Sequence, residues 1–308
     1  MLGSALRQAL AVLNLPVLQL VRQGQSSGDL VRWEPAASPA ISAHDAGRLE
    51  AMSAAIHLSG ANVAAHRWNA AYKREMAESR VESTRALART VAGLRQPPQV
   101  LLVASATGIY GSRVDEILDE ASAPGTNFLA HLCRQWEDAA QAAVEAGVRV
   151  VHLRFGVVLG PLDESKPGAL AHLVPLFRLG LGGPLGSGDQ WMSWISLADA
   201  IAAIVFAIRA PALSGALNVT SPNPVTNAKF AQALARALHR PAFLRAPAFA
   251  LRLALGQMAD EALLASARVL PAKLQAVGFQ FTHPTIDRAL TAALTSSRTE
   301  DVPPIVDS

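Results

Sequence analysis

The sequence predicts an α/β fold built on a doubly wound parallel sheet, and three observations support this. Apolar strands alternate with helical stretches along the chain, as they do when helices connect the strands of a parallel sheet. The run AAIHLSGAN (54–62) ends at Ser59 and Gly60, typical of a buried strand that runs into a turn. The 308 residues are 51% hydrophobic and 17% charged, enough apolar material for a large core in one or two domains.

The first half of the chain fits this pattern element by element. The helical spacing of Leu2, Leu6 and Leu10 predicts a helix, followed by short strands over 16–21 and 30–35. After the strand 54–62, a long helix is expected over 68–94. The elements expected next are a strand over 99–106, a helix over 128–146 that stops at Gly147, and a strand over 148–160.

The second half departs from this regular alternation. From about Lys166 a Gly-rich loop leads to a short strand and an apolar helix that ends at Ile208, followed by a strand over 216–222. Thr226 and Asn227 mark the start of a helix that ends at Leu238. We therefore expect a main α/β domain over 1–240, with substrate-lobe segments around 165–195, a C-terminal helical lobe over 241–292 and a disordered tail over 293–308.

Composition excludes several classes of function. The net charge of +3 comes without a basic block, so nucleic acid is not implied as a partner. The single cysteine, Cys133, rules out an internal disulfide framework and a multi-cysteine metal site, and suits a reducing cytoplasm. No apolar run is long enough to span a membrane. We expect a cytoplasmic protein with a small-molecule substrate, no nucleic-acid or membrane partner and no metal.

In open α/β sheets, ligands bind beyond the carboxyl ends of the strands. Here these places hold Arg22 and the turns 59–62, 105–111 and 155–160, three of them rich in small residues. Small residues let a flat cofactor approach the backbone, although α/β turns are Gly-rich in any case. Arg22 is more specific, because an arginine after the second strand of a dinucleotide site holds the extra phosphate of NADP, and no acid follows before Asp29. NADP is favoured over NAD, unless Arg22 is an ordinary solvated charge.

Several segments carry a family resemblance. They are HLSGAN, ESRVEST, ASATGIYG, LRFGVVLGP, GGPLGSGDQWMSWISLADA, NPVTNAKFAQALARALHRPAF and the C-terminal ADEALLASARVLPAKLQAVGFQF. Together they resemble the extended short-chain dehydrogenases/reductases, within them the atypical branch called epimerase-family proteins. The resemblance implies a Rossmann-type NAD(P)-binding domain with a small, mainly C-terminal substrate lobe. A homodimer would form through the helices 68–94 and 128–146.

The resemblance also implies a set of cofactor-binding residues. Arg80 among them has a simpler alternative, a salt bridge on a helix face. The set is Gly3, Arg22, Leu58, Ser59, Gly60, Ala61, Arg80, Ala104, Ser105, Tyr110 and Phe155.

Two features of the family are missing from the sequence. Members begin with a strand and a GxxGxxG loop, of which only Gly3 and the helix behind it are recognisable. Either the start lies upstream of Met1 or the main phosphate cradle is lost; we favour the first, since the remaining pattern would otherwise expose a central strand edge. The family's Tyr and Lys, four residues apart, are also absent: the helix FLAHLCRQWEDAA has neither, and neither Tyr72 nor Tyr110 has a Lys four residues on.

The remaining candidates are hydroxyls and aromatic rings. Ser105 and Thr107 lie where the family's catalytic serine or threonine falls, and either could orient a carbonyl or simply cap a turn. The stretch that usually carries a diphosphate-binding arginine has Met192 and Ser193 instead, so a nucleotide sugar is doubtful. An aromatic substrate pocket of Gln190, Trp191 and Trp194 is predicted, with core packing as the alternative for Trp194. Asp199 is interpreted as a helix cap, and His57 and His152 as satisfied core histidines.

We therefore expect an NADP-linked oxidoreductase or epimerase-like enzyme acting on a small molecule, with NAD less favoured. The alternative is a non-catalytic NADP-binding sensor or interaction protein, which the missing Tyr and Lys favour. A third reading is that the chain neither binds the cofactor nor catalyses a reaction.

Overall fold

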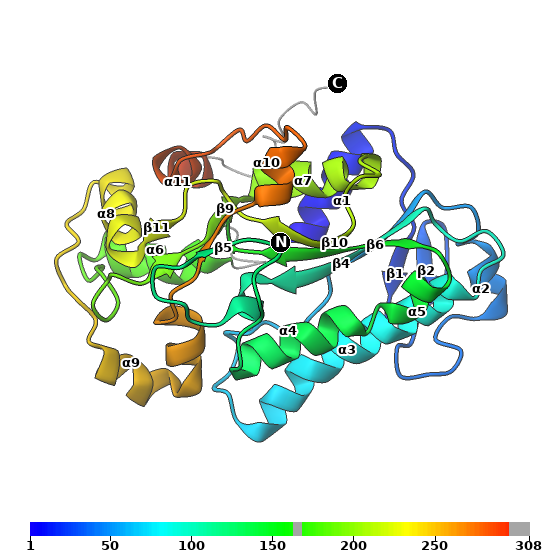
Figure 1. The fold of residues 1–308 in the computed structure, drawn as a ribbon, viewed down its shortest axis with the longest axis horizontal. Coiled ribbons are helices and arrows are strands. Elements are labelled where there is room, and N and C mark those ends of the chain that lie inside the picture. Colours follow the sequence, from blue (N-terminus) through cyan, green and yellow to red (C-terminus); the bar gives the residue numbers. More distant parts are fainter. Residues whose placement is uncertain (163–167, 296–308) are drawn as a thin grey trace.

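The computed structural model describes residues 1–162 and 168–295. Its main sheet has four parallel strands in the order β10-β6-β4-β3 (Figure 1). They are β3 (Ala54–His57), β4 (Val100–Ala106), β6 (Arg149–Phe155) and β10 (Gly215–Val219). β4 and β6 are almost completely buried, as expected of central strands covered on both faces. The predicted parallel sheet is confirmed.

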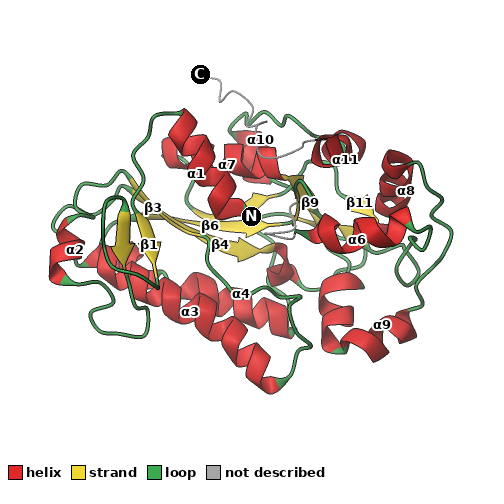
Figure 2. Ribbon diagram, turned by 180° about the vertical axis from the view of Figure 1, so that it is seen from behind, coloured by secondary structure: helices red, strands yellow, loops and turns green. Residues whose placement is uncertain are grey.

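The sheet is in two pieces. β1 (Gln19–Val21) and β2 (Leu30–Arg32) pair with each other in parallel, and no described strand bonds either of them to β3. The ring of Trp33, just after β2, meets the ring of His57 edge to face at 5.9 Å, so the two pieces touch there. Figure 2 shows the smaller piece beside the main sheet. The strand expected before Gly3 is not among the described residues.

Helices cover both faces of the main sheet, and these layers contain the large core cluster (Figures 1 and 2). One face carries α3 (Ala70–Ala92), α4 (Phe128–Asp138) and α5 (Gln141–Glu145); the other carries α1 (Leu2–Val12), α7 (Leu197–Arg209) and α10 (Ala272–Ala276). The expected helix 128–146 is therefore two helices that break at Ala139 and Ala140.

Side-chain caps fix where several helices start. The side chains of Asn69 at α3, Asn127 at α4 and Ser196 at α7 each accept a hydrogen bond from the backbone N–H three residues later. Thr226 does the same for α8 (Asn227–Leu238), as its sequence predicts. Each cap satisfies a backbone N–H that has no partner inside the helix.

A smaller lobe lies beyond the carboxyl ends of the main strands (Figure 2). The expected strand 148–160 divides at Gly156, where a Cβ would lie 2.7 Å from the Ser193 carbonyl oxygen, so only glycine fits. The chain then enters the lobe as β7 (Val157–Leu159), which pairs with β9 (Trp194–Ser196). The other pairs are β8 (Trp191–Met192) with β11 (Val225–Thr226) and β5 (Ile117–Leu118) with β12 (Arg268–Val269). The lobe also contains α6 (Ala169–Arg178), α8, α9 (Ala248–Leu255), the π-helical turn η2 (Ala259–Leu263) and α11 (Ile286–Thr295).

Contacts at the N-termini of α4 and α7 join the lobe to the main domain. Glu261 of η2 accepts a hydrogen bond from the Leu129 backbone N–H at 2.9 Å, at the N-terminus of α4. The Asp199 carboxylate accepts from the backbone N–H groups of Thr282 at 2.7 Å and His283 at 3.0 Å. The interpretation of Asp199 as the helix cap is wrong, because Ser196 is the N-cap of α7; Asp199 is a structural residue of the first turn.

The C-terminal end differs slightly from its prediction. α11 continues to Thr295, so it includes the first three residues of the tail expected to be disordered. The rest of that tail, 296–308, lies outside the described residues. Among the described helices, none is both long and apolar enough to cross a membrane.

His57 predicts a measurable pH dependence of stability. Burial lowers the pKa of this ring to about 4 from 6.5, and its Nε2 lies 2.9 Å from the Ser83 Oγ. Below about pH 6.5 the unfolded chain binds a proton there that the folded chain does not, so stability falls from pH 6.5 towards pH 4 by about 2 to 3 kcal/mol. Urea unfolding at several pH values should show a smaller loss of stability in His57→Gln. The matched variant His172→Gln, at an exposed histidine, should lose as much stability as the native protein. Equal losses in the two variants would contradict the role of His57.

Candidate active site

Two of the strand ends expected to form the site, those of β4 and β6, are neighbours in the structure. Ala106 at the end of β4 is the register partner of Phe155 at the end of β6, and Ala104 and Ser105 lie beside them on β4. The start of α1 reaches the same edge, because a Cβ on either Gly160 or Gly168 would lie 2.9 Å from the Met1 Sδ. Gly3 lies in the first turn of α1 with open space around it.

The turn after β3, Leu58–Ala61, rests on Arg80. Arg80 donates from Nη2 to the Ala61 carbonyl at 2.8 Å and from Nη1 to the Met76 carbonyl at 3.1 Å, and its guanidinium stacks 5.1 Å from the Trp136 ring centroid. A Cβ on Gly60 would lie 3.1 Å from the Arg80 Cζ, so the packing favours glycine. Ser59 and Gly60 are exposed. Arg80 supports this turn from beneath.

The alternative reading of Arg80 as a salt-bridged surface residue is wrong. It is buried, and no carboxylate of the described residues pairs with it. Burial lowers its pKa. Its two carbonyl contacts and the Trp136 ring hold the cation instead.

Arg22 follows β1 directly and is exposed. Its guanidinium has no hydrogen bond or ion pair within the described residues. Asp29 does not reach this end of the strand, because its carbonyl accepts from the Gln19 N–H, at the start of β1. Glu34, near the end of β2, is bound to Arg32 at 2.6 Å. The end of β1 thus presents a cation without an acid beside it.

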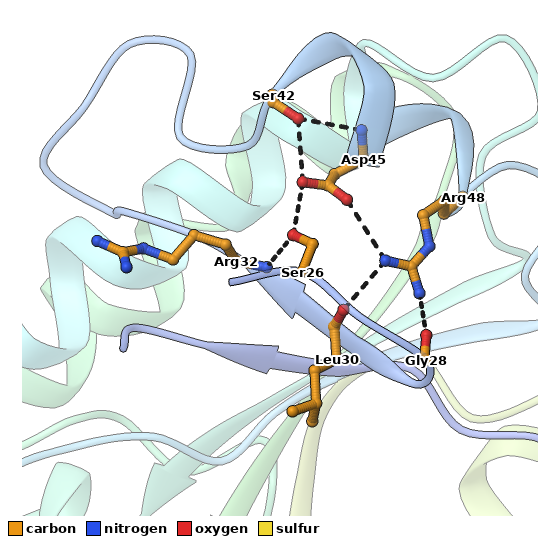
Figure 3. A network of polar contacts seen from close by, with 7 residues as sticks. All are labelled: Ser26, Gly28, Leu30, Arg32, Ser42, Asp45 and Arg48. Carbon is orange, nitrogen blue, oxygen red and sulfur yellow. Dashed lines mark hydrogen bonds and ion pairs between the residues drawn. The ribbon is translucent and has the colours of Figure 1, made fainter. Parts of the chain in front are cut away.

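The loop after Arg22 is held by a polar network (Figure 3). The buried Asp45 carboxylate accepts from the Ser26 Oγ at 2.7 Å and the Ser42 Oγ at 3.0 Å. Arg48 donates to Asp45, to the Leu30 carbonyl and to the Gly28 carbonyl. The Ser26 hydrogen bond, with those of Ser42 and Arg48, lowers the pKa of Asp45. The network fixes the loop and so the position from which Arg22 projects.

A second, buried network lies at the ends of β4, β6 and β10. Glu137 accepts from the Ser105 Oγ at 2.7 Å and, at both carboxylate oxygens, from Arg154 at 2.8 Å. Arg154 also donates to the Tyr110 hydroxyl at 2.9 Å, and that hydroxyl donates to the Asn218 Oδ1 at 2.7 Å. Burial opposes the charge of Arg154, but the hydrogen bonds and charge of Glu137 outweigh it and raise its pKa.

Two of the predicted site residues, Ser105 and Tyr110, belong to this network. Ser105 and Tyr110 are buried and their hydroxyls donate within the protein, while burial raises the pKa of Tyr110. Thr107 differs: it is half-buried, and its hydroxyl has no hydrogen bond to any described residue. Of the two predicted catalytic hydroxyls, that of Ser105 is hydrogen-bonded to Glu137, and only that of Thr107 has no hydrogen bond to a described residue.

On α4, Cys133 and Glu137 have the spacing of the missing Tyr and Lys. Cys133 is buried, and this burial raises the pKa of its thiol to about 11. A buried thiol with so high a pKa has little thiolate at neutral pH. We therefore expect Cys133 to react with 5,5′-dithiobis(2-nitrobenzoate) only after unfolding in guanidinium. Complete labelling of the native protein within minutes would contradict this.

The three predicted substrate residues have different environments. Trp194 is fully buried in the lobe core and donates from Nε1 to the Asn223 carbonyl at 3.1 Å, so its alternative, core packing, is correct. Gln190 is buried and its amide donates to the Leu185 and Leu263 carbonyls, each at 3.1 Å. Trp191 is only half-buried, and of the three its ring is the one that a ligand can reach.

The sequence reasoning missed the central residue of the buried network, Glu137. Its spacing from Cys133 was the available signal. His152 was interpreted as satisfied, but its Nδ1 is buried without a partner, so that interpretation is wrong for this atom; burial lowers its pKa. Among the described residues, no cluster of three histidine, cysteine, aspartate or glutamate side chains is arranged to hold a metal.

Comparisons with known proteins agree with this architecture. A family model described as the NAD dependent epimerase/dehydratase family matches residues 1–220, and a domain of unknown function, DUF1731, matches 246–293. An epimerase family protein of Mycobacterium bovis is 43% identical over 295 residues, covering 96% of this chain and 95% of the relative. The bovine epimerase family protein SDR39U1 is 34% identical over 293 residues, covering 94% and 95%.

A solved structure gives the same result. The crystal structure of human epimerase family protein SDR39U1 (isoform 2) with NADPH superposes with a TM-score of 0.84 at 31% identity, covering 95% of each chain. The predicted Rossmann-type fold is confirmed.

Proposed function

The chain belongs to the NAD-dependent epimerase/dehydratase family, and from that membership we propose that it binds NADP(H) and acts on a small molecule as an oxidoreductase or epimerase-like enzyme. The observation that carries the cofactor choice is Arg22, an exposed cation with no described partner at the end of β1. An arginine there suits the 2′-phosphate of NADP, whereas in NAD sites an acid at this place binds the ribose 2′-hydroxyl. The NADPH-bound human relative supports the same choice.

The residues present fit such a cofactor. Arg22 would hold the 2′-phosphate, and Gly3, in the first turn of α1, leaves open space in which the pyrophosphate could approach the backbone. The Leu58–Ala61 turn exposes Ser59 and Gly60 at the same edge, supported by Arg80. Of the strand-end residues beside them, Ala106 is half-buried, whereas Ala104, Ser105 and Phe155 are buried.

The bound nicotinamide would supply hydride transfer chemistry. The contribution of the protein is orientation. The half-buried Thr107 hydroxyl, free of described partners, is available to donate a hydrogen bond to a substrate oxygen. Ser105 and Tyr110 would act indirectly, because their hydroxyls are bound into the Glu137–Arg154 network that fixes the end of β4.

A non-catalytic NADP-binding protein is the second candidate. The observation that favours it is the pair Cys133 and Glu137 on α4, which has the four-residue spacing of the family's Tyr and Lys. This pair cannot replace their acid–base chemistry, because the thiol is buried and the carboxylate is paired with Arg154. Cytoplasmic location and a homodimer through α3 and α4 stay predictions from the sequence.

The test is NADPH oxidation with panels of aldehydes, ketones and quinones. The enzyme proposal expects turnover with at least one class, reduced about tenfold in Thr107→Val because a hydrogen bond to the substrate oxygen is lost. The matched Thr291→Val, at an exposed position of α11, should leave turnover unchanged. Tight NADPH binding without turnover on any panel would support the second candidate.

A further inference from the structure

Arg268 of the lobe carries a charge that no carboxylate of residues 1–162 or 168–295 neutralises. Its guanidinium stacks on the ring of Trp191, with Cζ 4.3 Å from the ring centroid. Its Nε is buried without a hydrogen-bond partner, and its terminal nitrogens make no hydrogen bond or ion pair to any described residue. An unpaired, partly desolvated guanidinium is costly unless something outside the chain neutralises it.

Two exposed apolar residues, Ile117 and Val114, belong to the segment that pairs with the strand of this cation. Arg268 is the register partner of Ile117, so the two side chains lie on the same face of the β5–β12 pair. Ile117 is 56% exposed, and Val114, three residues earlier, is 75% exposed. Ser266 links the Val114 and Trp191 segments, since its Oγ donates to the Val114 carbonyl and accepts from the Trp191 N–H at 3.0 Å.

Val114 is also strained. Its φ is +54°, a left-handed conformation that a β-branched residue rarely adopts. The Ser266 contact holds this conformation and leaves an apolar side chain in solvent instead of in the core. Strain of this kind concentrates at ligand sites.

These residues are close to the strand ends of the candidate active site. The segment that contains Val114 and Ile117 follows the 3₁₀ turn η1 (Thr107–Tyr110), which begins with Thr107. On the other side, the Ser193 carbonyl packs on Gly156, the residue after β6, and Trp191 lies two residues before Ser193. We call Arg268, Trp191, Val114 and Ile117 the Arg268 subsite.

We propose that the Arg268 subsite binds the anionic end of the substrate, a carboxylate attached to a flat apolar body. The guanidinium presents parallel N–H donors that match the two oxygens of a carboxylate. The Trp191 ring and the exposed apolar side chains beside it would cover the body. Glu116, the acid next to Ile117, does not compete for Arg268, because it is paired with Arg113 at 3.1 Å. This assignment rests on the proposed function, for which it names the substrate class.

Benzoate is the probe, with acetate and inorganic phosphate for comparison, read by tryptophan fluorescence of the full chain. Benzoate should give a saturable fluorescence change that is lost in Trp191→Phe. Acetate should bind about tenfold more weakly than benzoate, because it has no ring. Arg268→Gln should weaken benzoate about tenfold or more, and Arg268→Lys by less, because the charge remains. Arg252→Gln is the matched control, since Arg252 is a lobe arginine already paired with Asp260 at 2.8 Å.

Two results would overturn the subsite. One is benzoate binding that is equal in the native protein and Arg268→Gln. The other is acetate or phosphate binding as tightly as benzoate, which would leave no role for the apolar surface. Calorimetry with NADPH separates this from the proposed function. NADPH binding without benzoate binding would contradict only the subsite proposal. Arg268-dependent benzoate binding without NADPH binding would contradict only the cofactor proposal.

Discussion

Glu137→Ala is expected to lower the free energy of unfolding by about 3 to 5 kcal/mol, because it leaves a buried charge without its partner. Glu137 and Arg154 are 12% and 11% exposed and are joined by two hydrogen bonds of 2.8 Å. Ser105 would lose its acceptor at the same time. Urea unfolding followed by circular dichroism measures the change.

Two comparisons make this result specific. Glu145→Ala, at an exposed glutamate of α5 bound only to Gln141, should cost less than about 1 kcal/mol. The double variant Glu137→Leu with Arg154→Met removes both charges and should recover a large part of the loss. A single variant as stable as the native protein would show that the network does not hold the strand ends together.

Arg22→Gln is expected to weaken NADPH binding about tenfold to a hundredfold, since a charge-assisted contact to the 2′-phosphate is removed. NADH affinity should not change, because NADH has no phosphate at that position. Arg89→Gln, at an exposed arginine near the end of α3, is the charge-matched control. Calorimetric titration of the three proteins measures both affinities. Equal losses for NADPH and NADH would mean that Arg22 acts on the fold or on the shared part of the cofactor.

Regular patterns made most of the fold predictable. Long apolar strands such as 100–106 and capped helices such as Asn227–Leu238 follow from spacing and caps that are local in sequence. The break between α4 and α5 was missed because it falls on Ala139 and Ala140, both strong helix formers. The division of the strand at Gly156 was missed for another reason, since it depends on the Ser193 carbonyl, far away in sequence.

The candidate site was less predictable because its chemistry depends on pairing. Arg22 and Thr107 were predicted as site residues from their position after a strand, a local signal, and both stay predictions. The sequence could not show that Ser105 and Tyr110 are held in a buried network, because Glu137, Arg154 and Asn218 come from three separate elements. The unpaired charge of Arg268 was invisible for the same reason: finding it requires knowing which acids lie nearby.

The NADP site is tested by calorimetric titration of the native 308-residue protein with NADPH and then NADH. A phosphate-binding Arg22 predicts micromolar NADPH binding, stronger than NADH by about 1.4 kcal/mol or more, which is a tenfold difference in affinity. Equal affinities, stronger NADH binding or no binding of either nucleotide would contradict an NADP site built around Arg22.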